Sequence, residues 1–121
     1  MPIRSVLIVD DSPTDRQYLL DILAKSGFQV ATAQSAEEAL DKVRQQRPDL
    51  VLMDVVMPGQ NGFQATRTLS RDSATKDIPV IICTTKGQDT DRIWGMRQGA
   101  RDYIVKPVAP ADLLAKIAAL G

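Results

Sequence analysis

The sequence predicts an α/β fold in which one parallel β-sheet is covered by helices on both faces. Strand-like and helix-like stretches alternate along the 121-residue chain, and this alternation is typical of βαβ units. The strand-like runs are short, mostly apolar and bounded by turn residues, as expected of strands buried on both faces. Four of these runs lead directly into charged or hydroxyl side chains, which places polar groups at one edge of the sheet.

The first strand is expected at residues 4–9, and the first helix follows it. Ser12 is a suitable N-cap, Pro13 fits the first helical position, and Asp15 complements the positive end of the helix. Gly27 stops this helix. Its buried stripe is expected to consist of Leu19, Ile22 and Leu23.

The second strand is expected at residues 28–33, and the next helix begins at Ser35. Ser35 and Glu38 have the spacing of a capping box, in which each side chain accepts a hydrogen bond from the other residue's backbone N–H. Pro48 ends this segment. The inner face of the helix is expected to consist of Ala39, Leu40 and Val43.

The third strand is predicted at residues 50–53, and turn residues follow it. Pro58-Gly59 and Asn61-Gly62 are turn dipeptides, and both glycines are expected to need an open range of backbone angles. The third helix then covers residues 61–72. Its inward side chains are expected to be Phe63, Thr66 and Leu69.

The last two strands are expected at residues 80–83 and 102–105, and the last two helices at residues 88–98 and 110–120. Gly99 ends the first of these helices. Its large apolar residues are Ile93, Trp94 and Met96. The final helix has an apolar face made by Leu113, Leu114 and Ile117.

The composition argues against several classes of protein. Basic and acidic residues number 15 each, so the chain lacks the positive charge typical of a nucleic-acid-binding domain. No apolar run has the length of a transmembrane helix, and no signal peptide is recognisable, so no membrane partner is expected. The absence of histidine excludes a Ser-His-Asp triad and disfavours most zinc sites.

The length predicts a single domain over residues 1–121, with no output domain, and a monomer is expected. Cys83 is the only cysteine, so an intrachain disulfide is impossible and a reducing cytoplasm is the expected compartment. Because Cys83 lies inside an apolar run and no histidine could activate it, we interpret it as a small core residue.

The polar residues at the strand ends form a candidate site for phosphate chemistry. They are Asp10, Asp11, Asp54, Thr84 and Lys106. Three neighbouring carboxylates repel one another, so at least one pKa should rise unless a cation compensates. Mg²⁺ suits such oxygen ligands, and together with lysine and threonine it would bind a phosphoryl group. With these charges neutralised, Asp54 itself could accept that group as an acyl phosphate.

The motifs together resemble those of CheY-like response-regulator receiver domains. The relevant segments are Val-Asp10-Asp11-Ser, Leu-Met-Asp54-Val-Val-Met-Pro58-Gly59-Gln-Asn-Gly62, Thr84-Thr85 and Tyr103-Ile-Val-Lys106-Pro107. The resemblance covers the whole chain. It implies a flavodoxin-like (βα)5 three-layer sandwich, a doubly wound parallel sheet of order 2-1-3-4-5, and phosphotransfer from a histidine kinase to an aspartate.

The resemblance also implies roles for the acidic residues. Asp54 corresponds to the phosphoacceptor. Asp11 and Asp54 correspond to direct ligands of Mg²⁺, together with the backbone carbonyl of Val56. Asp10 is expected to act on the metal mainly through water.

The same resemblance implies a switch. Lys106 is expected to pair with the acid cluster and then with the phosphoryl group. Thr84 is expected to turn inward to the phosphoryl group, and Tyr103 to follow it from an exposed to a buried position. The Lys106-Pro107 peptide bond is expected to be cis, against a base rate of about 5–6% for X-Pro bonds.

A narrower resemblance involves residues 62–67 and 84–103, which are similar to stand-alone regulators of type IV pilus twitching motility and phototaxis, the PilG/PilH type. It implies a CheA-like histidine kinase as phosphodonor and a protein target bound by the fourth helix, fifth strand and fifth helix. No enzymatic activity is expected beyond Mg²⁺-dependent self-phosphorylation and autodephosphorylation. Trp94 is then either a packing residue or part of the partner-binding face.

Three other functions are considered from the residues alone. A phosphatase with an aspartyl nucleophile needs a second aspartate two positions later as general acid, but Val56 stands there. A flavodoxin-like FMN binder needs a loop rich in Ser, Thr and Gly, whereas Asp10, Asp11 and Asp15 repel phosphate in the absence of a metal. A docking module that is never phosphorylated would not need the complete set of acidic, hydroxyl and lysine side chains.

Overall fold

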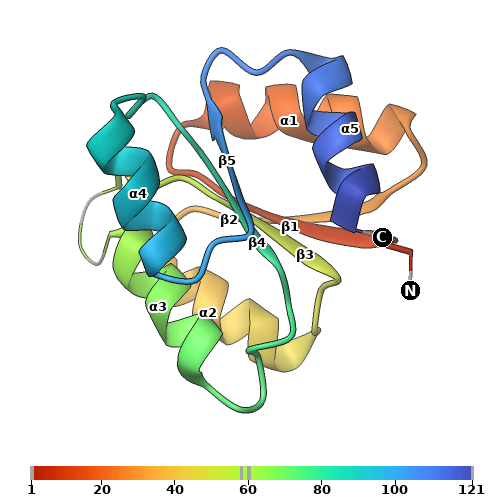
Figure 1. Cartoon of the computed structure of the whole chain (residues 1–121). Helices are drawn as coiled ribbons and strands as arrows, with labels where there is room; N and C mark the ends of the chain where they lie inside the picture. Colours follow the sequence, from red (N-terminus) through yellow and green to blue (C-terminus); the bar gives the residue numbers. More distant parts are fainter. Residues whose placement is uncertain (1, 58, 60, 121) are drawn as a thin grey trace.

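A computed structural model describes residues 2–57, 59 and 61–120, and within them strands and helices alternate as the sequence predicts (Figure 1). The strands are β1 (Ser5–Val9), β2 (Gln29–Ala33), β3 (Leu50–Met53), β4 (Val80–Thr84) and β5 (Asp102–Val105). The helices are α1 (Pro13–Lys25), α2 (Ala36–Gln45), α3 (Gly62–Arg71), α4 (Asp89–Arg97) and α5 (Pro110–Leu120). The bounds of β3, β5 and α5 are those predicted, and the others differ by a residue or two.

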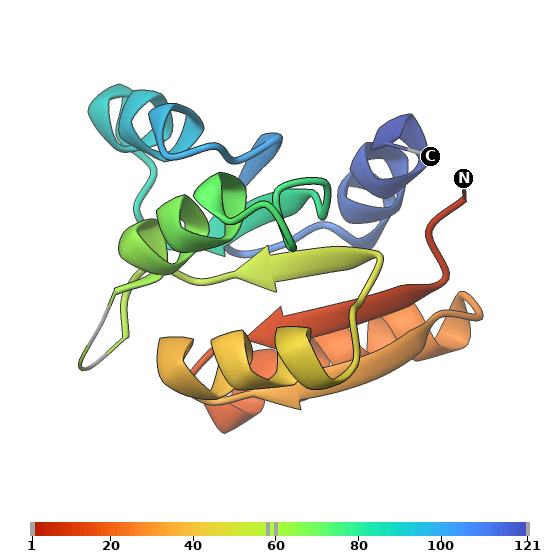
Figure 2. The ribbon, with the colours of Figure 1, turned by 90° about the horizontal axis from the view of Figure 1, so that it is seen from below.

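The strands form one parallel sheet in the order β2-β1-β3-β4-β5, which confirms the predicted topology (Figure 2). Val9 at the end of β1 lies opposite Ala33 of β2 and Met53 of β3. The backbone N–H of Asp10 still donates to the Ala33 carbonyl at 3.1 Å, and that of Asp54 donates to the Val9 carbonyl at 2.9 Å. The ladder therefore extends to both aspartates and brings them to the same edge.

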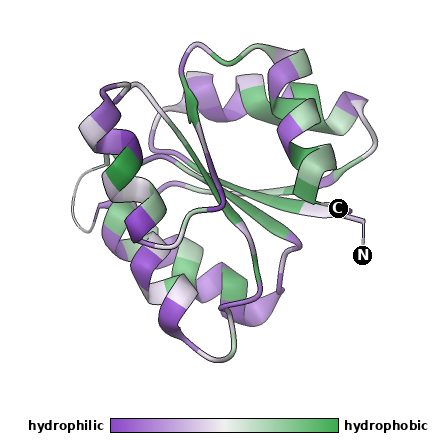
Figure 3. Cartoon of the chain, in the orientation of Figure 1, coloured by the Kyte–Doolittle hydropathy of each residue, from purple (hydrophilic) through white to green (hydrophobic). Residues whose placement is uncertain are grey.

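Helices α1 and α5 cover one face of the sheet, and α2, α3 and α4 cover the other (Figure 1). Because side chains alternate along a strand, each central strand contributes to two apolar cores, which appear as green strands between the helices in Figure 3. The core beside α1 and α5 contains Val6, Ile8, Leu50 and Leu52. The core beside α2 and α3 contains Leu7, Val9, Val51 and Met53.

The predicted helix starts are confirmed at α1 and only half confirmed at α2. Ser12 caps α1 by accepting a hydrogen bond from the Asp15 N–H at 3.3 Å. Ser35 caps α2 by accepting from the Glu38 N–H at 3.1 Å. The Glu38 carboxylate, however, accepts from the N–H of Gln34 and not from that of Ser35, so the reciprocal half of the box is displaced by one residue.

Glycine is required at positions 59 and 62 for different structural reasons. Gly59 has a positive φ of 78°, as predicted for a turn residue. For Gly62 the prediction is wrong, because this residue begins α3 and its φ is not positive. A Cβ at Gly62 would lie 2.0 Å from the Asp54 carbonyl oxygen, so close packing of α3 against β3 requires glycine there. Pro58 lies outside the described residues.

Several side-chain predictions are confirmed and others need adjustment. Cys83 is buried, as expected of a core residue. On α3, Thr66 and Leu69 are buried, but Phe63 is only partly buried and Ala65 takes a fully buried position. Within the described part of the chain, no helix combines the length and apolar composition that crossing a membrane requires.

Helix α4 is attached to the sheet differently from the others. Its three large apolar residues are exposed: Ile93 by 53%, Trp94 by 49% and Met96 by 45%. Gly95 faces the sheet so closely that a Cβ there would lie 2.8 Å from Ile82 Cδ1 and 3.1 Å from Tyr103 Cε2. The helix backbone itself thus rests on the side chains of β4 and β5.

Candidate functional site

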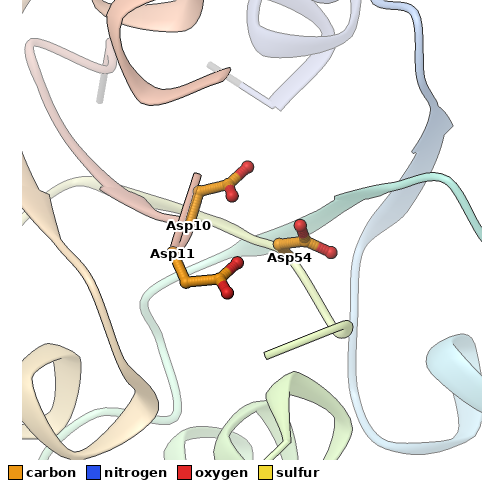
Figure 4. A group of neighbouring side chains, drawn as sticks. All are labelled: Asp10, Asp11 and Asp54. Carbon is orange, nitrogen blue, oxygen red and sulfur yellow. The ribbon is translucent and has the colours of Figure 1, made fainter. Parts of the chain in front are cut away.

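Three carboxylates meet at the C-terminal edge of the sheet. Asp10 and Asp11 follow β1, and Asp54 follows β3 (Figure 4). Each offers an oxygen atom, and these atoms lie within 4.8 Å of one another. Asp10 and Asp54 are buried, with 1% and 6% exposure, whereas Asp11 is exposed. The structure thus confirms that these predicted residues share one place.

Lys106 supplies a positive charge to this edge from the end of β5. Its ammonium Nζ lies 2.6 Å from Asp10 Oδ2 and 3.1 Å from Asp54 Oδ2. The backbone N–H of Lys106 donates to the Thr84 carbonyl at 2.8 Å, which extends the pairing of β4 with β5 by one residue. The Lys106-Pro107 peptide bond is cis, as predicted.

Backbone N–H groups fix the orientation of the two buried carboxylates. Asp10 Oδ1 accepts from the Ser12 N–H at 2.9 Å, and Asp54 Oδ1 accepts from the Val56 N–H at 3.0 Å. Since Lys106 bonds the second oxygen of each, both carboxylates are held at both oxygens. Such charge-assisted bonds are roughly twice as strong as neutral ones, so the site is well ordered.

The electrostatics agree with the expectation that one pKa rises in this cluster. Burial raises the pKa of the Asp10 carboxyl above its ordinary value, although Lys106 and the Ser12 N–H favour the charged form. Repulsion from Asp54 is a smaller cause than burial. Burial lowers the pKa of Lys106, but hydrogen bonds to Asp10 and Asp15 outweigh it, and the pKa lies above its ordinary value. Lys106 is therefore positively charged at neutral pH.

The donor set fits a hard divalent cation. All three candidate ligands are carboxylate oxygens, which Mg²⁺ prefers to nitrogen or sulfur. Asp11 is the exposed member and Asp54 the buried one, so a cation between them would face solvent on one side and the sheet on the other. Mg²⁺ typically keeps several waters and binds through one or two carboxylates, which this half-open arrangement permits.

Thr84 and Tyr103 are linked through the backbone of one residue. Thr84 is fully buried at the end of β4, and its Oγ1 accepts a hydrogen bond from the Lys86 N–H at 3.5 Å. The Tyr103 hydroxyl donates to the Lys86 carbonyl at 2.6 Å. Tyr103 is 3% exposed, so this structure shows it in the buried one of its two expected positions.

Arg92 of α4 adds a contact to the outer side of this tyrosine. Its guanidinium lies 5.6 Å from the centre of the Tyr103 ring, within the range of a cation–π interaction. Arg92 and Gly95 of α4 thus both lie next to the Tyr103 ring.

Two residues of α1 contribute contacts that the sequence analysis missed. Asp15 Oδ2 lies 2.8 Å from Lys106 Nζ, so the residue interpreted only as a favourable helix start also reaches the site. The Tyr18 hydroxyl donates to the Val108 carbonyl at 2.6 Å, two residues beyond Lys106. The available signal was position, since α1 begins directly after the two aspartates.

Comparison with known proteins decides the family. The model of the response regulator receiver domain family matches residues 6–118. The chain belongs to the response-regulator receiver family. Protein PilH of Pseudomonas aeruginosa is 56% identical over 115 residues, which are 95% of this chain and 95% of PilH.

Other receiver proteins show the same relationship. The phosphate regulon transcriptional regulatory protein PhoB of Escherichia coli is 38% identical over 97% of this chain, but the match spans only 51% of PhoB. The solved structure of Vibrio cholerae chemotaxis protein CheY4 has a TM-score of 0.91 and 33% identity, with 98% of this chain and 99% of that chain covered. This receiver is therefore a response regulator with a CheY-like fold and a close likeness to PilH.

Proposed function

We propose that Asp54 accepts a phosphoryl group from a phosphohistidine of a histidine kinase. The observation that supports this proposal is that Lys106 bonds one oxygen of Asp54 while the Val56 N–H bonds the other, beside two further carboxylates. These bonds hold the nucleophile in one orientation at the end of β3. Fixing a reactant in this way contributes to catalysis by removing orientational freedom.

The proposed transfer is a nucleophilic displacement at phosphorus. An Asp54 carboxylate oxygen forms the new P–O bond, and the P–N bond to the donor imidazole breaks. When the donor ring is protonated on its other nitrogen, the bonding electron pair stays on the nitrogen that carried phosphorus, and the products are a neutral histidine and an aspartyl phosphate. Lys106 then faces the added negative charge, and Thr84 supplies a hydroxyl donor at the same edge.

Magnesium is part of this proposal. Asp11, Asp54 and the backbone carbonyl of Val56 would hold the ion directly, and Asp10 would act through water. When bound, it would offset the charge of the carboxylates and of the phosphoryl oxygens.

The output of this proposed switch is carried by α4, β5 and α5. A phosphoryl group on Asp54 would draw Thr84 toward it, and the shared Lys86 backbone would pass that movement to Tyr103. Tyr103 touches the underside of α4 near Gly95. The exposed Ile93, Trp94 and Met96 then give this region the apolar character of a partner-binding surface.

The likeness to PilH supports a role in type IV pilus motility or taxis, with a CheA-like kinase as donor. We propose that the receiver acts as a monomer in a reducing cytoplasm, which its single, buried cysteine supports. It would have no enzymatic activity on other molecules beyond its own phosphorylation and dephosphorylation. Val56 at the position of a phosphatase general acid supports this view.

Acetyl phosphate with Mg²⁺ tests the proposal. We expect mass spectrometry to show one added phosphoryl group on the wild type and none on Asp54→Asn. Asp77→Asn is the matched control, because Asp77 is exposed and precedes β4 at the far end of the sheet. Trp94 fluorescence should change with uptake, since Trp94 is the only tryptophan and lies on α4. A wild type that gains no phosphate would contradict the proposal.

A further inference from the structure

We propose that Asp15 is a positioning residue that holds the Lys106 ammonium opposite Asp54. This inference rests on the proposed phosphorylation of Asp54 and adds a residue from outside the strand-end set. Lys106 Nζ lies 2.8 Å from Asp15 Oδ2, a shorter distance than the 3.1 Å to Asp54 Oδ2. Asp15 therefore makes the shorter contact of the two in this structure.

The contacts match the bonding capacity of the ammonium group. A lysine ammonium has three N–H donors, and Lys106 faces three carboxylates: Asp10, Asp15 and Asp54. Two of these acceptors come from strand ends, whereas Asp15 comes from the first turn of α1. Together they fix Nζ from three sides. Loss of Asp15 would leave the lysine with two acceptors on the sheet side and more freedom to rotate.

Helix α1 is itself tied to the site, which gives Asp15 a defined position even though its side chain is 44% exposed. The Arg16 guanidinium donates to the Asp10 carbonyl at 2.9 Å, which ties the helix start to the end of β1. Two residues further along the helix, the Tyr18 hydroxyl donates to the Val108 carbonyl in the loop that carries Lys106. Asp15 directly precedes these two attachments in the first turn of α1.

During phosphoryl transfer, the three N–H groups of Lys106 must change their hydrogen-bond acceptors. One N–H is needed by a phosphoryl oxygen once Asp54 has become an acyl phosphate, while Asp10 and Asp15 can keep the other two. A lysine held in this way meets the phosphoryl group without a search through its rotamers. Asp15 therefore acts on the reaction through Lys106 and does not touch the reacting atoms.

The test measures the initial rate of Asp54 phosphorylation by acetyl phosphate as a function of Mg²⁺ concentration. For Asp15→Ala we expect the maximal rate at saturating Mg²⁺ to fall roughly two- to fivefold, the size expected for a partly exposed ion pair. Asp15→Glu keeps a carboxylate within reach and should recover most of this rate. Asp21→Ala on the same helix should match the wild type, because Asp21 bonds Gln17 and lies a turn and a half further along.

A double-mutant cycle separates positioning from a general effect on charge or folding. In a Lys106→Met background, adding Asp15→Ala should change the residual rate by less than about 1.5-fold, since the shared partner is gone. If Asp15→Ala is poorly folded by circular dichroism, Asp15→Asn, which keeps the shape, serves in the same cycle. An undiminished maximal rate, or an equal loss in both backgrounds, would overturn the inference alone. A wild type that is never phosphorylated would overturn the proposed function as well.

Discussion

Two regions beside the same sheet are built in opposite ways. The acidic edge consists of Asp10, Asp11, Asp54 and Lys106, and the α4 surface consists of Ile93, Trp94 and Met96. At the acidic edge, buried polar side chains are held by hydrogen bonds from several elements, and Asp10 is only 1% exposed. On α4, apolar side chains point outward, and Trp94 is 49% exposed. Gly95, without a side chain, makes the close contact between this helix and the sheet.

This difference indicates which region can move. Displacing a carboxylate of the acidic edge would break charge-assisted hydrogen bonds in a buried place, which is costly. Displacing α4 would break a contact that has no interlocking side chain at its centre. Elements with few buried apolar contacts open at lower free energy than the core does. The acidic edge is thus suited to chemistry, and α4 to a change of position.

The largest loss of stability is expected from a substitution at Gly62, which packs against the acidic edge at Asp54. In Gly62→Ala the new Cβ would meet the Asp54 carbonyl oxygen at 2.0 Å, and backbone must shift to relieve this contact. We expect the free energy of unfolding to fall by about 3 kcal/mol or more, the upper range for overpacking, despite the better helix propensity of alanine. Urea unfolding measures this value. A loss below about 1 kcal/mol would show that the α3–β3 contact is softer than the structure implies.

A second prediction concerns Tyr103, at the border of the two regions. Burial raises the pKa of its hydroxyl from 10.0 to about 12. Because the unfolded state loses this proton first, stability should fall between these two pH values, by up to about 1.4 kcal/mol per pH unit. Below pH 10 this residue should contribute no pH dependence. Urea unfolding between pH 9 and 12 checks the slope, and Tyr103→Phe should lack it. Identical slopes in both proteins would contradict the buried phenol.

The smallest effect on stability is expected at Gly95. In Gly95→Ala the new Cβ would meet only the ends of two side chains, at 2.8 Å for Ile82 Cδ1 and 3.1 Å for Tyr103 Cε2. These side chains can move, and alanine favours a helix over glycine by about 1 kcal/mol. The free energy of unfolding should therefore change by less than about 1 kcal/mol. The Tyr103 ring should shift, and its phenol should ionise at lower pH than in the wild type by absorbance titration. An unchanged titration would place α4 further from Tyr103 than the structure has it.

The sequence predicted the layered fold because each signal for it is local. Short apolar runs fix the strands, and residues such as Ser12 and Gly27 fix the ends of a helix. The strand ends also predicted which polar residues share an edge, since the fold class alone brings the ends of parallel strands together. For this reason the sequence alone predicts that Asp10, Asp54 and Lys106 lie at one edge of the sheet.

The remaining features depend on distances across the fold, which local patterns do not contain. The sequence pattern identifies Asp15 only as a residue of the first helical turn. Its contact with Lys106 depends on how the loop after β5 lies next to α1. Gly62 reads as a turn residue, because its close contact is with the Asp54 backbone on another element. The exposure of Trp94 was left open for the same reason, since a short helix with apolar residues on several sides does not show which side is covered.

The connection through Lys86 has a consequence for how this protein can diversify. Thr84 and Tyr103 both bond main-chain atoms of that residue, so its side chain takes no part in the connection. In the proposed switch, a mutation at position 86 would therefore change the local charge while leaving these two main-chain hydrogen bonds in place. The surface chemistry of this loop could then evolve without disturbing the link between Thr84 and Tyr103.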